Sequence, residues 1–213
     1  MSGAAAGSGP WAVVHVPHSS AAVPEDVRAT FALSDEMLQQ ELLRLTDRYT
    51  DEIFALDPAV AISVVFEVSR VVVDPERFLD DAIEPMASRG MGAVYTATTD
   101  GARLRVGLRE TERDELLARF YEPHHEMLEA ATENVLSATG RCLVIDGHSF
   151  PSEPLPSDLN QERPPSGLYR DRSFPYALKA CLRGCGALSR SWPNCRDRPA
   201  LRGSARARSM LPA

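Results

Sequence analysis

The chain has 213 residues, of which 44% are hydrophobic and 25% charged, and this is enough apolar material for one globular domain with a sizeable core. A net charge of −7 argues against non-specific nucleic-acid binding, which needs a basic surface. No apolar stretch reaches the ~18–20 uncharged residues of a membrane helix, so we expect neither a nucleic-acid nor a membrane partner.

The first predicted elements follow a short leader. Residues 1–10 are small and flexible, with neither a charged nor an apolar signal region, and they predict a disordered leader on a cytoplasmic protein. The apolar run 12–16 ends at Pro17 and predicts a buried strand. Residues 34–54 then carry apolar side chains at helical spacing, which predicts a helix with one buried face.

Further strands and one long helix follow. The strands are expected at 61–68, 70–74 and 141–146. Residues 111–137 predict a helix that Pro123 interrupts, and residues 147–151 a loop beyond the last strand. Strands that alternate with helices predict an α/β fold. In such folds ligand sites lie outside the carboxyl ends of the strands.

Two histidines occupy places of this kind. His18 and His148 each stand just beyond an apolar strand, where they could converge on one metal ion. The alternative is that each caps its own strand by hydrogen bonding. His15 lies inside its strand, and we interpret it as a packed core histidine.

Several charged residues also lie within the stretch 69–78. Arg70 and Arg77 carry guanidinium groups, which suit carboxylate substrates and can stabilise the oxyanion of an attacked amide. The alternative is an arginine that forms a salt bridge at a strand end. His125 lies where the long helix is interrupted, and helical histidines there are often inert.

Together these motifs resemble the N-formylglutamate amidohydrolase family. The matching segments, in the family's order, are Val16–Ser20, Thr46–Asp47, Ser69–Asp74, Tyr121–His125 and Asp146–Ser149. The resemblance implies a zinc-dependent hydrolase that cleaves the formyl amide of N-formylglutamate, a small-molecule substrate of histidine degradation. The family is similar to zinc carboxypeptidases and aspartoacylase. This implies a three-layer α/β sandwich on a mixed sheet, of the phosphorylase/hydrolase-like type.

The resemblance also implies roles for single residues. His18 and His148 would bind zinc, and Arg70 would polarise the scissile carbonyl. Arg77 would bind the substrate's carboxylate, and Asp74 would orient a histidine ligand from behind.

The match departs from the pattern at two places. Relatives supply a third ligand three residues after the first histidine, where this chain has Ala21. We predict Asp47 as the replacement, with Asp74 and Glu67 as rivals. The stretch 75–78 differs from the Asn-Arg form of the family, which leaves the exact acyl substrate open. We add His125 to the predicted substrate-binding residues.

The composition changes after Arg163. Residues 164–213 are rich in arginine, hold three of the four cysteines and contain none of the five histidines. A metal knuckle or disulfide among Cys181, Cys185 and Cys195 lacks a fourth ligand nearby. We therefore predict an incomplete amidohydrolase-like domain at 11–163 and a non-native or disordered tail at 164–213.

A frameshift near Pro164 would explain this tail, because a one-base shift recovers family-like segments twice. An authentic basic tail is the alternative. By the resemblance, the lost strands would carry the general base. We therefore expect little activity from the chain as written, and the alternative function is a catalytically impaired protein that binds carboxylates or zinc.

Overall fold

A mixed sheet forms the centre of the fold. The computed structural model describes residues 9–151, 153–159 and 161, together with the backbone of 176–184. Within these residues the strand order is β2-β1-β3-β4. The strands are β1 (Ala12–Val16), β2 (Ala61–Val65), β3 (Leu143–Pro151) and β4 (Tyr176–Gly184). β1 pairs in parallel with β2 and β3, whereas β4 pairs antiparallel with β3.

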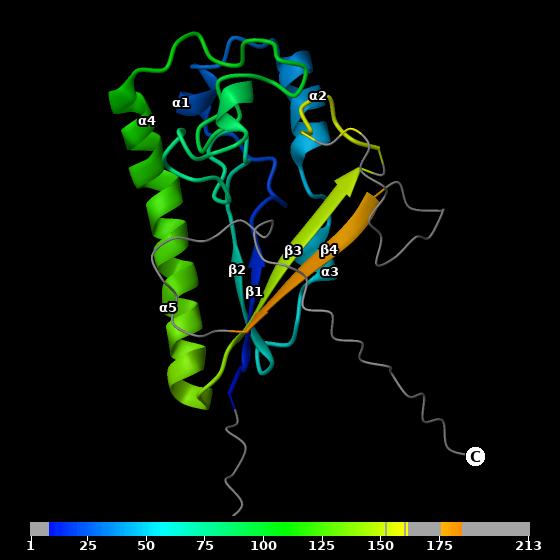
Figure 1. The fold of residues 1–213 in the computed structure, drawn as a ribbon, viewed down its shortest axis with the longest axis vertical. Helices are drawn as coiled ribbons and strands as arrows, with labels where there is room; N and C mark the ends of the chain where they lie inside the picture. Colours follow the sequence, from blue (N-terminus) through cyan, green and yellow to red (C-terminus); the bar gives the residue numbers. More distant parts are fainter. Residues whose placement is uncertain (1–8, 152, 160, 162–175, 185–213) are drawn as a thin grey trace, which may run out of the picture.

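Helices lie against both faces of this sheet. They are α1 (Glu25–Arg28), α2 (Asp35–Leu45), α3 (Thr50–Ile53), the 3-10 turn η1 (Ala87–Arg89), α4 (Glu110–Leu116), the π-helical turn η2 (Leu117–Tyr121) and α5 (Glu122–Thr139). Figure 1 shows α5 along one face, and α3 contacts β3. The predicted α/β fold is confirmed, and the three-layer arrangement of a complete domain stays a prediction.

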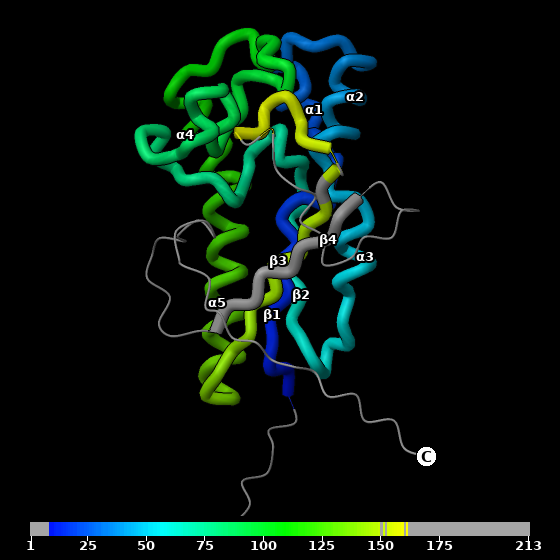
Figure 2. The backbone as a smooth tube through the Cα atoms, turned by 45° about the vertical axis from the view of Figure 1, so that its right-hand side comes forward, coloured from blue at the N-terminus to red at the C-terminus, as the bar shows by residue number. Residues whose placement is uncertain are grey.

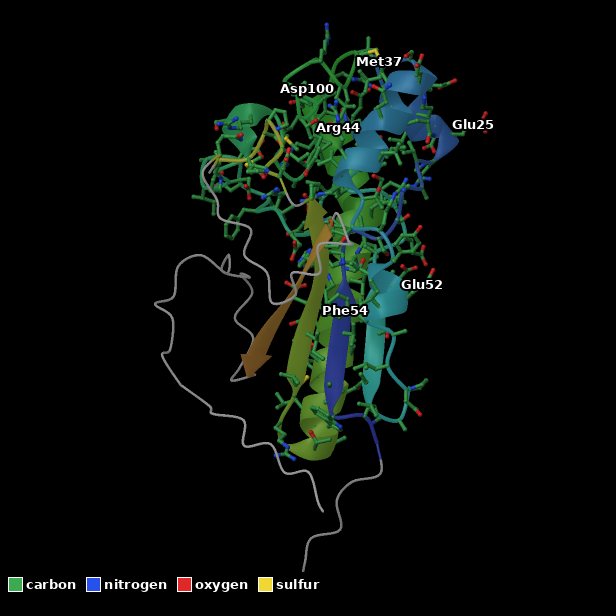
Figure 3. All side chains as sticks on the ribbon, turned by 90° about the vertical axis from the view of Figure 1, so that its right-hand side faces the viewer. Glu25, Met37, Arg44, Glu52, Phe54 and Asp100 are labelled. Carbon is green, nitrogen blue, oxygen red and sulfur yellow. The ribbon has the colours of Figure 1, made fainter. Side chains whose placement is uncertain are left out.

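The alternation of side chains along β1 explains how both faces are covered. All residues of β1 are buried, as expected for a central parallel strand. Val13 packs with Leu128 of α5, whereas Val14 belongs to the apolar cluster against which Phe54 packs. Figure 3 shows Phe54 beside the strands. His15 shares the face of Val13 and therefore points toward α5.

Loops and short helices gather beyond the carboxyl ends of the parallel strands (Figures 1 and 2). A large apolar cluster holds them together; it includes buried residues of α1, α2, α4 and the segment 66–104. This end of the sheet is where the predicted site residues lie.

The predicted helix over 34–54 is wrong in one respect, because it is two helices. Ser34 caps α2 as expected, since its Oγ accepts a hydrogen bond from the backbone N–H of Met37 at 3.3 Å. α2 ends at Leu45, and Tyr49 adopts a φ of 64° before α3 begins. In the intervening turn the backbone N–H of Asp47 donates to the carbonyl of His18 at 2.9 Å.

The predicted strand over 70–74 is also wrong. This segment is a buried turn, in which the N–H of Val72 donates to the carbonyl of Ser69 at 2.8 Å. Buried Arg105 donates to the carbonyls of Val72 and Tyr95 at 2.9 and 2.8 Å. The backbone of this segment therefore forms its hydrogen bond with an arginine side chain instead of with a neighbouring strand.

The last predicted strand and the long helix differ less from expectation. β3 continues through 147–151, predicted as a loop, because β4 pairs with it as far as Pro151. The interruption at Pro123 is present, as the π-helical turn precedes it and Pro123 lies in the first turn of α5. No helix in the described part of the chain is long and apolar enough to cross a membrane.

Candidate metal centre

Two histidines face each other beyond the carboxyl end of β1: His18 follows this strand by two residues, and His148 lies within β3. Their ring centroids lie 5.3 Å apart. His18 Nε2 donates to Asp74 Oδ1 at 2.9 Å, and His148 Nδ1 donates to Asp47 Oδ2 at 3.0 Å. Each ring is therefore fixed through one nitrogen by a buried carboxylate. The other nitrogen of His18, Nδ1, is buried and has no hydrogen-bond partner among the described residues.

Glu76 approaches the remaining nitrogen of each histidine. Its Oε1 lies 3.2 Å from His148 Nε2, and its Oε2 lies 3.8 Å from His18 Nδ1. One donor atom from each of the three residues lies within 4.8 Å of the others. Two histidines and a glutamate are a known donor set of catalytic zinc sites, and they leave one coordination position open. The group is thus able to hold a metal ion.

The three residues predicted as alternatives for the third ligand lie in different places. Asp47 Oδ2 accepts hydrogen bonds from His148 Nδ1 and from the backbone N–H of Ser149 at 3.1 Å, and it lies 3.8 Å from His18 Nδ1. Burial of Asp47 raises its pKa, but the hydrogen bond from His148 and the nearby His18 ring outweigh this and hold the pKa below its usual value. Asp74 is bound to the far side of His18. Glu67 is exposed.

Asp74 is the centre of a buried polar network. Its side chain is fully buried. Oδ1 accepts from His18 and from the backbone N–H of Glu76 at 3.0 Å, and Oδ2 accepts from Arg70 Nη2 and the Tyr95 hydroxyl, each at 2.7 Å. Burial opposes the ionisation of Asp74, yet the charge of Arg70 and the other donors hold its pKa well below the usual value. The same carboxylate thus orients His18 and fixes Arg70.

The predicted substrate-binding residues lie around the next turn. Arg77 Nε is 3.3 Å from Asp74 Oδ2, and its Nη1 is 3.6 Å from Glu84 Oε1. His125 Nε2 donates to the carbonyl of Pro75 at 2.8 Å, and its ring lies 4.2 Å from that of Tyr121. Both side chains are therefore attached to the segment 75–77 that carries Glu76.

His15 belongs to a second group of donors. Its Nδ1 lies 2.8 Å from Asp146 Oδ1 and its Nε2 lies 2.9 Å from His124 Nε2. His15, Glu76 and Asp146 also have donor atoms within 4.8 Å of one another. The core position predicted for His15 is present, but its ring is hydrogen-bonded at both nitrogens.

Carboxylates dominate the charge of this region. Burial by itself lowers the pKa of His148, but the negative charge of Glu76 and the hydrogen bonds to Asp146 and Asp47 raise it well above its usual value. These carboxylates therefore favour a positive charge at the place where His18 Nδ1 and His148 Nε2 both approach Glu76.

Comparison with known proteins identifies the family of the chain. The sequence model of the N-formylglutamate amidohydrolase family matches residues 11–184. The chain belongs to this family. The match extends past Arg163, where the predicted domain ends, and it includes β4. No curated protein matches at a significant level.

A solved structure supports the fold of this family member. The crystal structure of N-formylglutamate amidohydrolase from Ralstonia eutropha JMP134 superposes with a TM-score of 0.61 at 21% sequence identity. The alignment covers 68% of this chain and 56% of that protein. At this level of identity the likeness concerns the fold. The predicted domain boundaries stay predictions, because 1–8, 164–175 and 185–213, including Cys185 and Cys195, lie outside the described residues.

Sequence reasoning about this family member missed three residues of the site. Glu76 lies two positions after Asp74, inside the stretch 75–78 that differs from the family's pattern. This difference was the one signal in the sequence that could have pointed to Glu76. The sequence indicated Asp146 only as a member of the motif that also contains His148. Tyr95 is fully buried and its hydroxyl donates to Asp74. No local pattern in the sequence predicts this contact.

Proposed function

We propose that the chain is a zinc-dependent amidohydrolase that acts on N-formylglutamate or a related N-acyl amino acid. The observation that carries this proposal is the pair His18 and His148, each held by a carboxylate through one nitrogen while the other faces Glu76. Membership of the N-formylglutamate amidohydrolase family supports the substrate class. Bound zinc would lower the pKa of a water molecule and polarise an amide carbonyl.

We assign the third ligand to Glu76 and an orienting role to Asp47. Histidines that bind a metal donate their other N–H to a carboxylate or carbonyl. Asp47 and Asp74 occupy that place for His148 and His18 respectively. Asp47 also accepts the backbone N–H of Ser149, so its Oδ2 is already engaged. Glu76 is the carboxylate that approaches both free nitrogens.

The remaining residues would bind and orient the substrate. Arg70 is fixed by Asp74 and by the Tyr95 hydroxyl, to which its Nε donates at 3.2 Å, and it would stabilise the oxyanion of the attacked carbonyl. Arg77 would bind the carboxylate of the substrate. His125, hydrogen-bonded to the carbonyl of Pro75, would contact the substrate beside Arg77.

Zinc titration of the purified chain, with formate release from N-formylglutamate as the activity assay, tests the proposal. We expect one zinc ion per chain, and none bound by the His18→Ala/His148→Ala double variant. Glu76→Gln should weaken zinc binding more than Asp47→Asn does. For Asp47→Asn we expect the zinc affinity to fall by about 10–100-fold, as for other residues that hydrogen-bond a metal ligand without binding the metal. The reverse order would make Asp47 the ligand. A wild-type chain that binds no divalent ion would refute the metal site.

A second candidate is a binding protein of this family without efficient turnover. The pairing of Arg77 with both Asp74 and Glu84 favours it, because this arginine is already neutralised. The alignment also covers only 56% of the solved relative, and by the family resemblance the general base is predicted on strands that this chain lacks. Zinc binding with no measurable formate release would select this candidate.

A further inference from the structure

A buried chain of polar contacts leads from α5 to the candidate metal centre. His124 of α5 contacts His15 of β1 through the two Nε2 atoms at 2.9 Å, and His15 Nδ1 lies 2.8 Å from Asp146 Oδ1. The second oxygen of this carboxylate, Oδ2, lies 3.6 Å from His148 Nε2. His15, His124 and Asp146 are all buried, so water does not compete for these contacts.

The hydrogen-bond directions follow from the chemistry of the three groups. The carboxylate oxygen Asp146 Oδ1 is a hydrogen-bond acceptor, and His15 Nδ1 is the ring nitrogen beside it at 2.8 Å. His15 must then donate from Nδ1. Burial and neighbouring histidines lower the pKa of His124 to about 3, so its ring is neutral. The two Nε2 atoms, 2.9 Å apart, share one hydrogen bond, and His124 is its donor when the His15 proton lies on Nδ1. This agrees with the lack of a hydrogen-bond partner for His124 Nδ1 among the described residues.

We propose that His15 and His124 are positioning residues that act on the metal centre through Asp146. Anchoring Oδ1 prevents the carboxylate from rotating, so Oδ2 stays beside His148 Nε2 and Glu76. A fixed negative charge at this point strengthens the attraction for a cation held by His148 and Glu76. The inference rests on the proposed function, because it needs a metal at this place.

The central measurement is the zinc dissociation constant of the full chain and of five variants, obtained by competition with a chromogenic chelator. We expect His15→Phe to weaken zinc binding by about 10–100-fold, the range for outer partners of metal ligands. His124→Phe is one contact further away and should weaken it by roughly tenfold at most. The aromatic ring at 124 would still pack edge-on against Phe66, whose centroid lies 4.8 Å away, so folding should survive.

Two further variants separate positioning from a structural role. His124→Gln keeps an N–H that can reach His15 and should restore most of the affinity. In the His15→Phe background, His124→Phe should have no additional effect, because the path to Asp146 is already broken. Thr132→Val is the matched control: Thr132 is buried on the same helix, and its hydroxyl donates to the carbonyl of Leu128 at 2.8 Å. It should leave zinc affinity unchanged.

A second readout needs no metal. Nitrogen-15 NMR of the histidine rings in the metal-free chain should show the His15 proton on Nδ1 and the His124 proton on Nε2. A His15 ring with its only proton on Nε2 would overturn the proposal. So would variants that lower the melting temperature while binding zinc as tightly as wild type. If the wild-type chain itself binds no zinc, the proposed function fails first, and the two failures are thus distinguishable.

Discussion

Replacing Asp74 by asparagine should destabilise the protein strongly. The Asp74 carboxylate is fully buried and accepts hydrogen bonds from Arg70 and Tyr95 at 2.7 Å, from His18 at 2.9 Å and from the Glu76 N–H at 3.0 Å. The asparagine side chain would lack the charge and would turn an NH₂ group toward some of these donors. Removing one partner of a buried ion pair costs about 3–5 kcal/mol, because the other charge stays buried and unpaired.

Urea unfolding, followed by circular dichroism with a chelator present, measures this loss. A domain has an unfolding free energy of about 5–15 kcal/mol, so the substitution removes a large fraction of it. With a slope of about 2 kcal/mol/M, the unfolding midpoint should fall by roughly 1.5–2.5 M. The slope itself should not change, because the surface exposed on unfolding is the same. The chelator excludes stabilisation by bound metal.

Asp100→Asn is the control, since it also removes the carboxylate partner of an arginine. Asp100 pairs with Arg44 at an exposed position near the C-terminal end of α2 (Figure 3). An exposed pair of this kind contributes about 0.2–1 kcal/mol. If Asp74→Asn lost no more stability than Asp100→Asn, the interpretation of Asp74 as the centre of the site would be refuted.

Four further outcomes are expected. Burial raises the pKa of Tyr95 to about 12. The contribution of Tyr95 to the unfolding free energy should therefore be complete below pH 10 and be lost as the pH rises from 10 toward 12, and Tyr95→Phe should remove this loss. Leu128→Ala should lower the unfolding free energy by about 2–5 kcal/mol, because Leu128 is buried beneath the sheet. Gly147→Ala should lower it by about 1–3 kcal/mol, as the new Cβ would lie 2.7 Å from the Phe54 ring; normal stability would contradict this packing. Zinc at a hundredfold excess over its dissociation constant should raise stability by about 2.7 kcal/mol in wild type and not in His148→Ala, as thermal unfolding would show.

The sequence predicted the parts of the site that are local. An apolar run that ends in Pro17 and a second one that ends near Asp146 identify strands whose carboxyl ends meet. For this reason His18 and His148 were expected to lie together, and their rings are 5.3 Å apart. The Ser34 cap could be predicted for the same reason, because capping depends on a few neighbouring residues.

The sequence did not reveal features that depend on distant contacts. The apolar spacing continues across the break between α2 and α3, so periodicity alone could not find the turn that carries Asp47. Its left-handed residue is Tyr49, a residue type that rarely adopts φ = 64°. Similarly, Glu76 becomes a metal-site residue only because β3 brings His148 to it. The segment 70–74 has the composition of a strand, but the Arg105 side chain donates a hydrogen bond to a carbonyl of this segment where a neighbouring strand would otherwise pair.

The contact that positions the site also fixes the register of the sheet. β1 and β3 pair with His15 opposite Asp146, and the two side chains are hydrogen-bonded on the α5 side. Because side chains alternate between faces, a slip of β3 by one residue would move Asp146 and His148 to the opposite face, where Phe54 packs. Such a slip would bury the Asp146 carboxylate among apolar groups without its histidine partner, at a high cost in free energy. The polar pair between β1 and β3 therefore selects the one register in which His148 can reach His18 and Glu76.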